Sequence, residues 1–402
     1  MAGKLAAQGA GILLVTANVG SLFEDPENLQ KTWLREFCQT VQAHRPLFVA
    51  LHCQEVGGKN YEASMTHVDK LLSSDALKDF SRARVYLDKN YQSQEQFTAL
   101  GCCYFIHESL KNIQQFDFKA KKFRKVVGKE VCSDALPSAA MLEKEKFPQD
   151  YFPEVRHSVL CLLQSRFSHE ALAFDLVNIH LFHDASNLVA WEKSPSVYSG
   201  TRQKALGFVM DRITDQRFER LPYFIFGDFN FRLDSKQVIE SLCSTASVQT
   251  VRSADTNEVD KLIFRESDND PDGLYITPAL TLSLFLCVCL QLLEFDRELS
   301  VFKERLHELD ISFPPSYPYS EDSSQGKQYM NTRCPSWCDR ILMSASARDL
   351  LVKPENEEKL ITYDNIGPNV CMGDHKPVYL YFRLNTGAGK PHANKHKCCV
   401  VQ

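Results

Sequence analysis

One stretch decides the fold that we expect for this chain: Leu221-Pro222-Tyr223-Phe224-Ile225-Phe226-Gly227-Asp228-Phe229-Asn230-Phe231-Arg232-Leu233. Its aromatic and aliphatic first half is typical of a buried strand. Gly227 permits a sharp bend, and a carboxylate and an amide follow it. Because residues two apart on an extended backbone share a face, we expect Asp228 and Asn230 to project together from the strand's end. A single Gly-Asp turn is more often structural than catalytic, so the rest of the chain must decide its role.

Three other expected strands also end in polar side chains. One apolar run ends at Asn18, a second ends at Glu55 before two glycines, and a third alternates in polarity and ends at His180. Each of these residues could simply cap a strand, and a histidine there is usually a packed or surface residue. Their similar positions, together with Asp228, instead favour a shared site at one edge of a sheet.

The remaining pattern is that of an α/β chain. We expect strands at residues 11–20, 46–55, 82–87, 98–107 and 174–184. Two further strands are expected to begin within residues 331–342 and 373–380. Helices are expected at residues 27–44, 65–80, 199–217 and 294–310. The basic segment 111–130 is expected to be a solvated hairpin rather than a substrate contact.

The composition is that of an ordinary soluble globular protein. The chain has 402 residues, of which 44% are hydrophobic and 24% charged, and it carries a net charge of −5. It therefore has no global basic field for nucleic acid, and a polyanionic substrate would need a local cluster of cations. Fourteen cysteines without a secretory signal indicate reduced thiols in the cytosol.

An uncharged run at residues 274–293 could be scored as a membrane span. Pro278 and several polar side chains weaken that interpretation. A span here would also place Asp228 and the C-terminal motifs on opposite sides of a membrane. If these motifs form one site, the span cannot exist.

The polar residues at expected strand ends and adjoining loops have the parts needed for metal-assisted hydrolysis of a phosphate ester. Oxygen ligands with few carboxylates suit Mg²⁺, which keeps several waters and shares phosphate oxygens. A carboxylate can align and deprotonate water, and a histidine paired with an aspartate can hold a proton beside a phosphoryl group. The set is Asn18, Glu55, His180, Asp228, Asn230, Asp339, Asp374 and His375.

Six motifs occur in the order found in a known enzyme family. They are Thr16-Ala17-Asn18-Val19, Gln54-Glu55, Asn178-Ile179-His180-Leu181, Gly227-Asp228-Phe229-Asn230-Phe231-Arg232, Pro335-Ser336-Trp337-Cys338-Asp339-Arg340-Ile341 and Asp374-His375-Lys376-Pro377-Val378. The chain resembles the inositol polyphosphate 5-phosphatases over most of its length, and its match is closest to the type I inositol trisphosphate 5-phosphatases. The last two motifs together are highly specific.

The resemblance implies a four-layered α/β sandwich of the endonuclease/exonuclease/phosphatase superfamily. It implies that Glu55 and Asn18 hold Mg²⁺, that Asp228 orients and deprotonates water, and that Asn230 supports the pentavalent phosphorus. His375, oriented by Asp339, would contact the scissile phosphate. The residues that would complete the site are His180 and Asp374, and those that would meet the substrate's other phosphates are Arg333, Arg340 and Lys376.

The implied activity is Mg²⁺-dependent removal of the 5-phosphate from soluble inositol 1,4,5-trisphosphate and inositol 1,3,4,5-tetrakisphosphate, which ends a calcium-mobilising signal. We expect a monomer with a catalytic domain at residues 1–386 and a tail at residues 387–402. Two alternatives remain open: a phosphoinositide lipid 5-phosphatase, and an inactive, prenylated inositol-phosphate-binding protein. A nuclease is disfavoured by the Trp337-Cys338-Asp339-Arg340 motif and by the acidic net charge.

The last four residues carry an independent signal. Cys399-Val400-Val401-Gln402 fits the C-a-a-X prenylation pattern, and a final Gln favours farnesyl. Lys395 and Lys397 lie just upstream, and Cys398 could be a second acylation site. We therefore expect a farnesyl anchor on Cys399 and a location at the cytoplasmic face of the plasma membrane.

Two segments depart from the family pattern: residues 155–172 and residues 272–293. Both have abrupt edges, as alternative exons or an incorrect gene model would produce. The first replaces a strand that would pack beside His180. We expect stability and substrate affinity, rather than the mechanism, to be affected.

Overall fold

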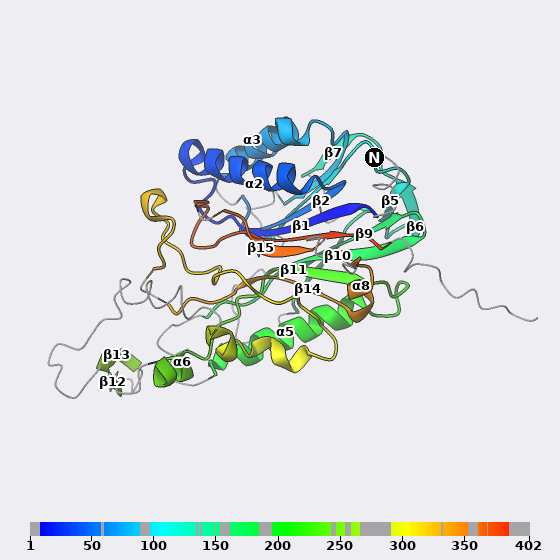
Figure 1. The fold of residues 1–402 in the computed structure, drawn as a ribbon. Helices are drawn as coiled ribbons and strands as arrows, with labels where there is room; N and C mark the ends of the chain where they lie inside the picture. Colours follow the sequence, from blue (N-terminus) through cyan, green and yellow to red (C-terminus); the bar gives the residue numbers. More distant parts are fainter. Residues whose placement is uncertain are drawn as a thin grey trace, which may run out of the picture.

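The structure is a computed structural model of the chain. It describes residues 9–57, 60–88, 97–133, 136, 139–148, 150–152, 161–184, 195–242, 247–253, 259–265, 291–330, 333–352, 361–367 and 369–385. Two large sheets pack face to face between outer helices (Figure 1). This confirms the four-layered sandwich that the family resemblance implied.

The first sheet is built around β1 and β2, whose side chains are buried on both faces. These two strands are parallel, while β16 pairs with β1 and β4 pairs with β2 in antiparallel register. The uninterrupted apolar runs of β1 and β2 suit such a doubly covered position. The strand order is β15 (Thr362–Asn365), β16 (Val378–Arg383), β1 (Gly11–Asn18), β2 (Phe48–Gln54), β4 (Gly101–Ile106), β3 (Arg82–Leu87) and β7 (Lys129–Cys132).

The second sheet is built around β10 and β11, which are parallel and place His180 directly opposite Asp228. Its order is β14 (Asp339–Met343), β11 (Tyr223–Asp228), β10 (Leu172–His180), β9 (Cys161–His169), β5 (Ile113–Asp117) and β6 (Lys122–Lys125), and β8 (Glu143–Lys146) also pairs with β9. A separate two-stranded sheet consists of β12 (Ser247–Arg252) and β13 (Val259–Arg265).

Helices cover the outer face of each sheet. Side chains of α2 (Lys31–His44) and α3 (Tyr61–Leu72), including Trp33 and Val68, join one apolar cluster with the first sheet. Side chains of α5 (Val197–Ile213), including Val209, join another with the second sheet. The largest cluster lies between the sheets and contains Leu14 and Phe226. The shorter elements are η1 (Pro26–Gln30), η3 (Asp75–Leu77), α6 (Ser235–Leu242), η5 (Leu293–Phe295), η6 (Glu298–Phe302), η7 (Ser323–Gln325) and α8 (Ala345–Arg348).

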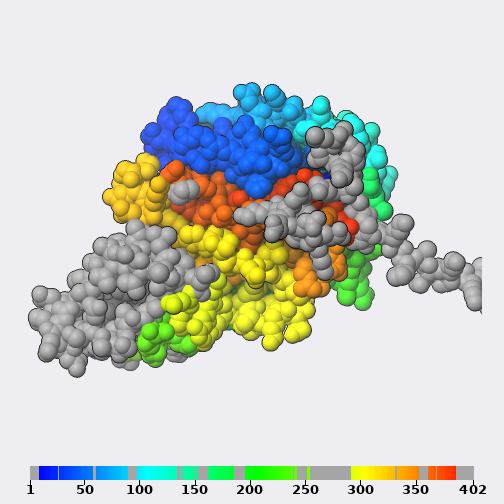
Figure 2. Space-filling view, viewed as in Figure 1, coloured from blue at the N-terminus to red at the C-terminus, as the bar shows by residue number. Residues whose placement is uncertain are grey.

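The expected helix at residues 294–310 is wrong. The segment contains two short 3₁₀ turns, η5 and η6, and then extended chain. Its acidic side chains explain why its charged pattern was misleading: Glu298 binds Arg202 of α5, and Asp296 and Glu308 bind Arg340 of β14. In Figure 2 this segment (yellow) lies along the side of the sandwich below the last strands.

The structure also corrects one consequence drawn from the atypical segment 155–172. Residues 161–169 form β9, and this strand pairs with β10 along almost its whole length. Arg166 of β9 makes a two-point ion pair with the buried Asp175 of β10, at 2.6 and 2.9 Å. A strand therefore does pack beside the strand that carries His180, and the basic hairpin expected at residues 111–130 is formed by β5 and β6.

Among the described residues, each helix is too short or too polar to cross a bilayer. Most of the uncharged run at 274–293, the tail at 387–402 and the expected domain boundary at residue 386 lie outside the described residues. The expectations drawn from the sequence for these residues therefore stay predictions.

Candidate active site

The C-terminal ends of four strands from two different sheets meet at one end of the sandwich. β1 ends in Asn18, and Glu55 follows β2 directly in the neighbouring position. β10 and β11 end in His180 and Asp228, which lie opposite one another. Asp339 begins the antiparallel strand β14 opposite Asp228. The topology therefore brings together residues that are more than three hundred positions apart in the chain.

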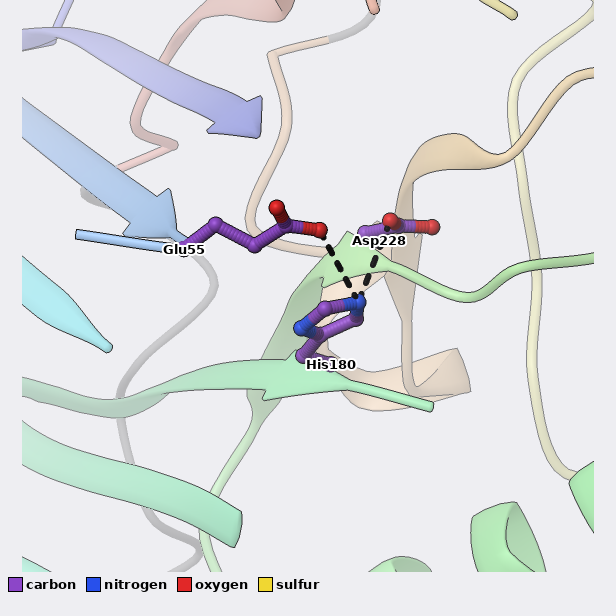
Figure 3. Close-up of side chains that lie close together, drawn as sticks. All are labelled: Glu55, His180 and Asp228. Atoms are coloured by element: carbon purple, nitrogen blue, oxygen red, sulfur yellow. Dashed lines mark ion pairs between the residues drawn. The ribbon is translucent and has the colours of Figure 1, made fainter. Parts of the chain in front are cut away.

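Asp228 lies at the centre of this group. Its Oδ2 accepts a hydrogen bond from Asn18 Nδ2 at 3.1 Å and lies 3.4 Å from His180 Nε2. Asn18 Nδ2 also donates to Glu55 Oε1 at 2.8 Å, and this carboxylate oxygen is 3.9 Å from His180 Nε2. Figure 3 shows the His180 ring between the two carboxylates. Asp228 is buried, whereas the Glu55 side chain is about half exposed.

A second chain of contacts orients His375. Its Nδ1 lies 2.8 Å from Asp339 Oδ2, and the same oxygen accepts a hydrogen bond from Ser316 Oγ at 2.7 Å. The other ring nitrogen, Nε2, lies 3.7 Å from Asp228 Oδ2 and 3.8 Å from Asp374 Oδ1. Asp339 thus fixes the ring while Nε2 points toward the group around Asp228.

The charges of these residues are strongly coupled. Burial would lower the pKa of His375, but the carboxylates of Asp339 and Asp228 outweigh that effect and raise its pKa to about 10. Burial would raise the pKa of Asp228, but His375 and His180 outweigh it and hold the pKa below its ordinary value. At neutral pH the site therefore contains an imidazolium at His375 beside an ionised Asp228.

Asn230 reaches the site in a different way from the one expected. Its backbone has a φ of +53°, so it is not extended, and the expected same-face projection with Asp228 is wrong. Instead the Asn230 amide N–H donates to Asp228 Oδ1 at 2.8 Å, and its side chain donates to the Leu181 carbonyl at 2.8 Å. Asparagine tolerates this left-handed conformation better than most residues. Asn230 therefore fixes Asp228 through its backbone.

Arg232 was not predicted as a site residue, although it lies within the stretch that decides the fold. Its guanidinium is buried, donates to Asn230 Oδ1 at 2.9 Å and lies over the Tyr317 ring, 4.4 Å from its centroid. Tyr317 in turn packs against His375, with ring centroids 4.8 Å apart. Arg232 therefore links the two halves of the site. Ser316 and Tyr317 were also missed, because they lie in a loop that carries no periodic signal.

The three predicted substrate-binding cations have different surroundings. Arg333 donates to the Tyr317 hydroxyl and so lies beside the site. Arg340 is buried in ion pairs with Asp296 and Glu308, at 2.6 and 2.7 Å, on the opposite side of β14 from Asp339. The structure therefore contradicts its expected role as a phosphate contact.

Lys376 is also unsuited to the expected phosphate contact. It is buried, and its Nζ donates to the backbone carbonyls of Gly326, at 2.6 Å, and of Val370. Burial lowers its pKa to about 8. Its contacts are those of a residue that holds two loops together, which corrects the sequence-based role.

The ligand atoms present fit a divalent cation. Single atoms of Glu55, His180 and Asp228 lie within 4.8 Å of one another. Asn18 presents its amide nitrogen, not its oxygen, to the two carboxylates. Carboxylate oxygens are ligands that hard cations prefer, and a half-turn of the Asn18 amide would bring its Oδ1 to the place of Nδ2. A cation would also offset the repulsion between the two carboxylates.

Comparisons with known proteins agree with this geometry. A family model described as endonuclease/exonuclease/phosphatase family 2 matches residues 284–381. The inositol polyphosphate 5-phosphatase domain of SPsynaptojanin, solved with inositol (1,4)-bisphosphate and calcium ion, superimposes with a TM-score of 0.53 at 14% identity and covers 93% of this chain and 84% of its own. At that identity the likeness shows the fold alone.

Relatives of known name are much closer in sequence. Inositol polyphosphate-5-phosphatase A from Homo sapiens is 70% identical over 412 residues, which cover 100% of both chains. A Caenorhabditis elegans protein named as a probable type I inositol 1,4,5-trisphosphate 5-phosphatase is 34% identical over 92% of this chain and 99% of its own. Full-length identity at this level shows that the chain belongs to the inositol polyphosphate 5-phosphatase family.

Proposed function

We propose that this chain removes the 5-phosphate from soluble inositol 1,4,5-trisphosphate and inositol 1,3,4,5-tetrakisphosphate, with Mg²⁺ as its cofactor, and so ends a calcium-mobilising signal. One observation carries the proposal. Asn18, Glu55, His180, Asp228 and the His375–Asp339 pair meet at one end of the sandwich in a chain whose relatives are named as inositol polyphosphate 5-phosphatases.

Glu55 and Asn18 would hold the metal, with Asp228 close by. When bound, Mg²⁺ supplies positive charge that offsets the charge developing on the phosphoryl oxygens. The exposure of Glu55 suits a ligand that faces incoming substrate, because the metal must also be reached by phosphate.

The protein's own residues account for the other requirements of in-line attack by water. Asp228, fixed by the Asn230 backbone and by Asn18, can orient a water molecule and accept its proton. His375 carries a proton on Nε2, held there by Asp339, and so presents a positive N–H to a phosphoryl oxygen. His180 lies between the carboxylates and can donate to the same group.

We further propose that a farnesyl group on Cys399 anchors the chain to the cytoplasmic face of the plasma membrane. The C-a-a-X pattern supports this. One lipid chain gives only reversible binding, so a second membrane signal is needed for stable attachment.

Phosphate release from inositol 1,4,5-trisphosphate, measured with and without Mg²⁺, tests the proposed activity. We expect Mg²⁺-dependent release that falls by about 100-fold or more in Asp228→Asn, because that variant keeps the side-chain shape but loses the base. Asp211→Asn is the matched control, since this carboxylate is exposed on α5 and pairs with Arg305 rather than with a site residue.

Two results would count against the proposal. Faster turnover of the phosphorylated lipid than of the free head group would favour the lipid 5-phosphatase. Folded protein that binds inositol 1,4,5-trisphosphate without releasing phosphate would favour the inactive binding protein.

A further inference from the structure

The charge of this molecule is unevenly distributed along the sandwich. The chain as a whole carries a net charge of −5, yet residues 111–129 contain seven cations and one carboxylate. We call this segment, which contains β5 and β6, the basic hairpin. Lys122 and Lys125 project from β6, and both are exposed. Such a concentration of charge in a net acidic chain indicates a local function for this surface.

The basic hairpin lies toward the end of the sandwich opposite the active site. Ile113 at the start of β5 pairs with His169, which ends β9 at the β9–β10 turn, whereas His180 is at the far end of β10. The next segment continues at the same end, because Lys129 of β7 pairs with Ala83 at the start of β3. Figure 1 shows β5 and β6 at the right-hand end of the sandwich.

The turn between β6 and β7 exposes an apolar side chain to solvent. Val127 is 67% exposed, the largest fraction among the exposed large hydrophobic residues of the described chain. Its backbone is nonetheless fixed, because Arg84 donates to the carbonyls of Val127 and Gly128 at 3.0 and 3.1 Å. An apolar tip between Lys125 and Lys129 matches a lipid surface, which offers anionic head groups and an apolar interior.

The C-terminal chain also leaves the sandwich at this end. Leu384, just after β16, donates its backbone N–H to the Ala10 carbonyl, and β16 pairs Arg383 with Gly11 at the start of β1. Asn18, at the active-site end, is the last residue of the same β1 strand. The sequence beyond Asn385 contains three further lysines before Cys399.

A group of carboxylates lies at the active-site end. Glu321 interacts there with Asp374, Glu24 and Glu55. An anionic membrane would attract the hairpin end and repel this acidic group. The charge distribution therefore favours one orientation of the molecule.

We propose that the basic hairpin and Val127 form a membrane-docking surface for anionic lipid head groups, and that docking there directs the active site away from the bilayer. The proposal deepens the proposed function: the hairpin supplies the second signal that a single prenyl chain needs, and the open site faces the soluble substrate.

The rival explanation is that the lysines only protect an edge strand. β6 is at the edge of the second sheet, and charged edge strands resist pairing with other molecules. That explanation predicts aggregation of charge-altered variants and no dependence of binding on anionic lipid.

Sedimentation of the full chain with vesicles separates these explanations. The unlipidated protein is mixed with vesicles of phosphatidylcholine alone or with added phosphatidylserine. We expect binding only with phosphatidylserine, and loss of that binding with added salt. The double variant Lys122→Glu/Lys125→Glu should bind about tenfold more weakly or worse. Lys31→Glu/Lys303→Glu is the matched control, since it makes the same charge change at exposed lysines outside the hairpin.

Equal binding by the hairpin variant, or equal loss in the control variant, would overturn the proposal. Aggregation of the hairpin variant with unchanged vesicle binding would support edge protection alone.

The orientation of the bound protein is tested by phosphate release from inositol 1,4,5-trisphosphate, which should be unchanged when the protein is bound to vesicles. Inhibition on binding would place the site against the membrane and refute the orientation. If no phosphate is released even without vesicles, the proposed activity is refuted, and the docking surface is then tested by the vesicle-binding assay alone.

Discussion

The single contact that most affects the chemistry is the one between Asp339 and His375. In Asp339→Asn the amide oxygen can still accept from His375 Nδ1, but the negative charge that raises the pKa of His375 to about 10 is lost. We expect kcat to fall by about 100-fold and the alkaline limb of the pH–rate profile to move toward neutral pH. An unchanged alkaline limb would show that another group controls it.

The same pair predicts how stability depends on pH. The folded-state pKa of His375 lies above its unfolded value of about 6.5, so protonation stabilises the folded state. That contribution is complete below about pH 6.5 and is lost as the pH rises through about 10. Denaturant unfolding at several pH values should show this loss in the wild-type chain and a smaller one in Asp339→Asn.

Gly20 makes a prediction about the metal site. A Cβ at this position would lie 2.7 Å from Glu55 Oε2 and 3.5 Å from Asn18 Oδ1. The Glu55 side chain is exposed enough to move aside, so Gly20→Ala should fold normally but raise the Mg²⁺ concentration that gives half-maximal activity. Gly200→Ala is the control, since no described residue lies within 4 Å of a Cβ placed there. Equal Mg²⁺ dependence in both variants would argue against Glu55 as a metal ligand.

The position of a site residue could be predicted from sequence where a polar side chain ended an apolar strand. It could not be predicted where backbone conformation or distant ion-pair partners determine where the side chain lies. Asn18, His180 and Asp228 lie where the strand pattern predicted. The left-handed backbone of Asn230 leaves no trace in its neighbours. Arg340 was misjudged although alternation along β14 was available: if Asp339 faces the site, the next residue faces away.

At the scale of elements, adding a Cβ should have opposite effects on stability at two glycines, one in a helix and one in a strand. Gly207 lies in the interior of α5, where no residue of the described ranges comes within 4 Å of an added Cβ. A Cβ on Gly227 would lie 1.9 Å from the Ile179 carbonyl oxygen on the neighbouring strand β10. Gly207→Ala should raise the free energy of unfolding by about 0.5–1 kcal/mol, because alanine is the better helix former. Gly227→Ala should lower it by about 3 kcal/mol, because β10 and β11 must separate.

Denaturant unfolding of the two glycine variants measures both effects. Activity distinguishes them further: Gly207→Ala should keep full kcat, and Gly227→Ala should lose it because the shift displaces Asp228. Similar unfolding free energies for the two variants would contradict the close approach of β10 and β11.

Strands were easier to predict than the segments that join them. The runs of β1, β2 and β11 are apolar on both faces, and only a sheet covered on both sides buries such a pattern. Residues 294–310 have a helical pattern of charges, but those charges bind buried arginines from α5 and β14. Sequence alone cannot show that a charged side chain has a buried partner far along the chain.

At the scale of the whole molecule, the site depends on how the two sheets face each other. Asn18 and Glu55 come from the first sheet, and His180 and Asp228 come from the second. The pairing of the sheets is long-range in sequence, which is why local patterns predicted the residues but not their distances. Asn178 and Gln54 tie the sheets together close to these ends, with Gln54 Nε2 donating to Asn178 Oδ1 at 2.8 Å.

Loss of the hydrogen bonds of Asn178 should lower both stability and kcat, although Asn178 contacts none of the catalytic side chains. Asn178 also donates to the carbonyls of Cys53 and Gly101, at 3.1 and 2.9 Å, so Asn178→Ala leaves several buried polar groups unpaired. We expect the free energy of unfolding to fall by about 3 kcal/mol. We also expect kcat to fall at temperatures where the protein is still folded, because the carboxylates held by the two sheets no longer keep their spacing.

The control is Gln114→Ala, which removes an exposed amide on β5 and should change neither the free energy of unfolding nor kcat. If Asn178→Ala lost stability but kept full kcat until it unfolded, the spacing of the site would have to be maintained locally by Asn18 and Asp228 rather than by the sandwich.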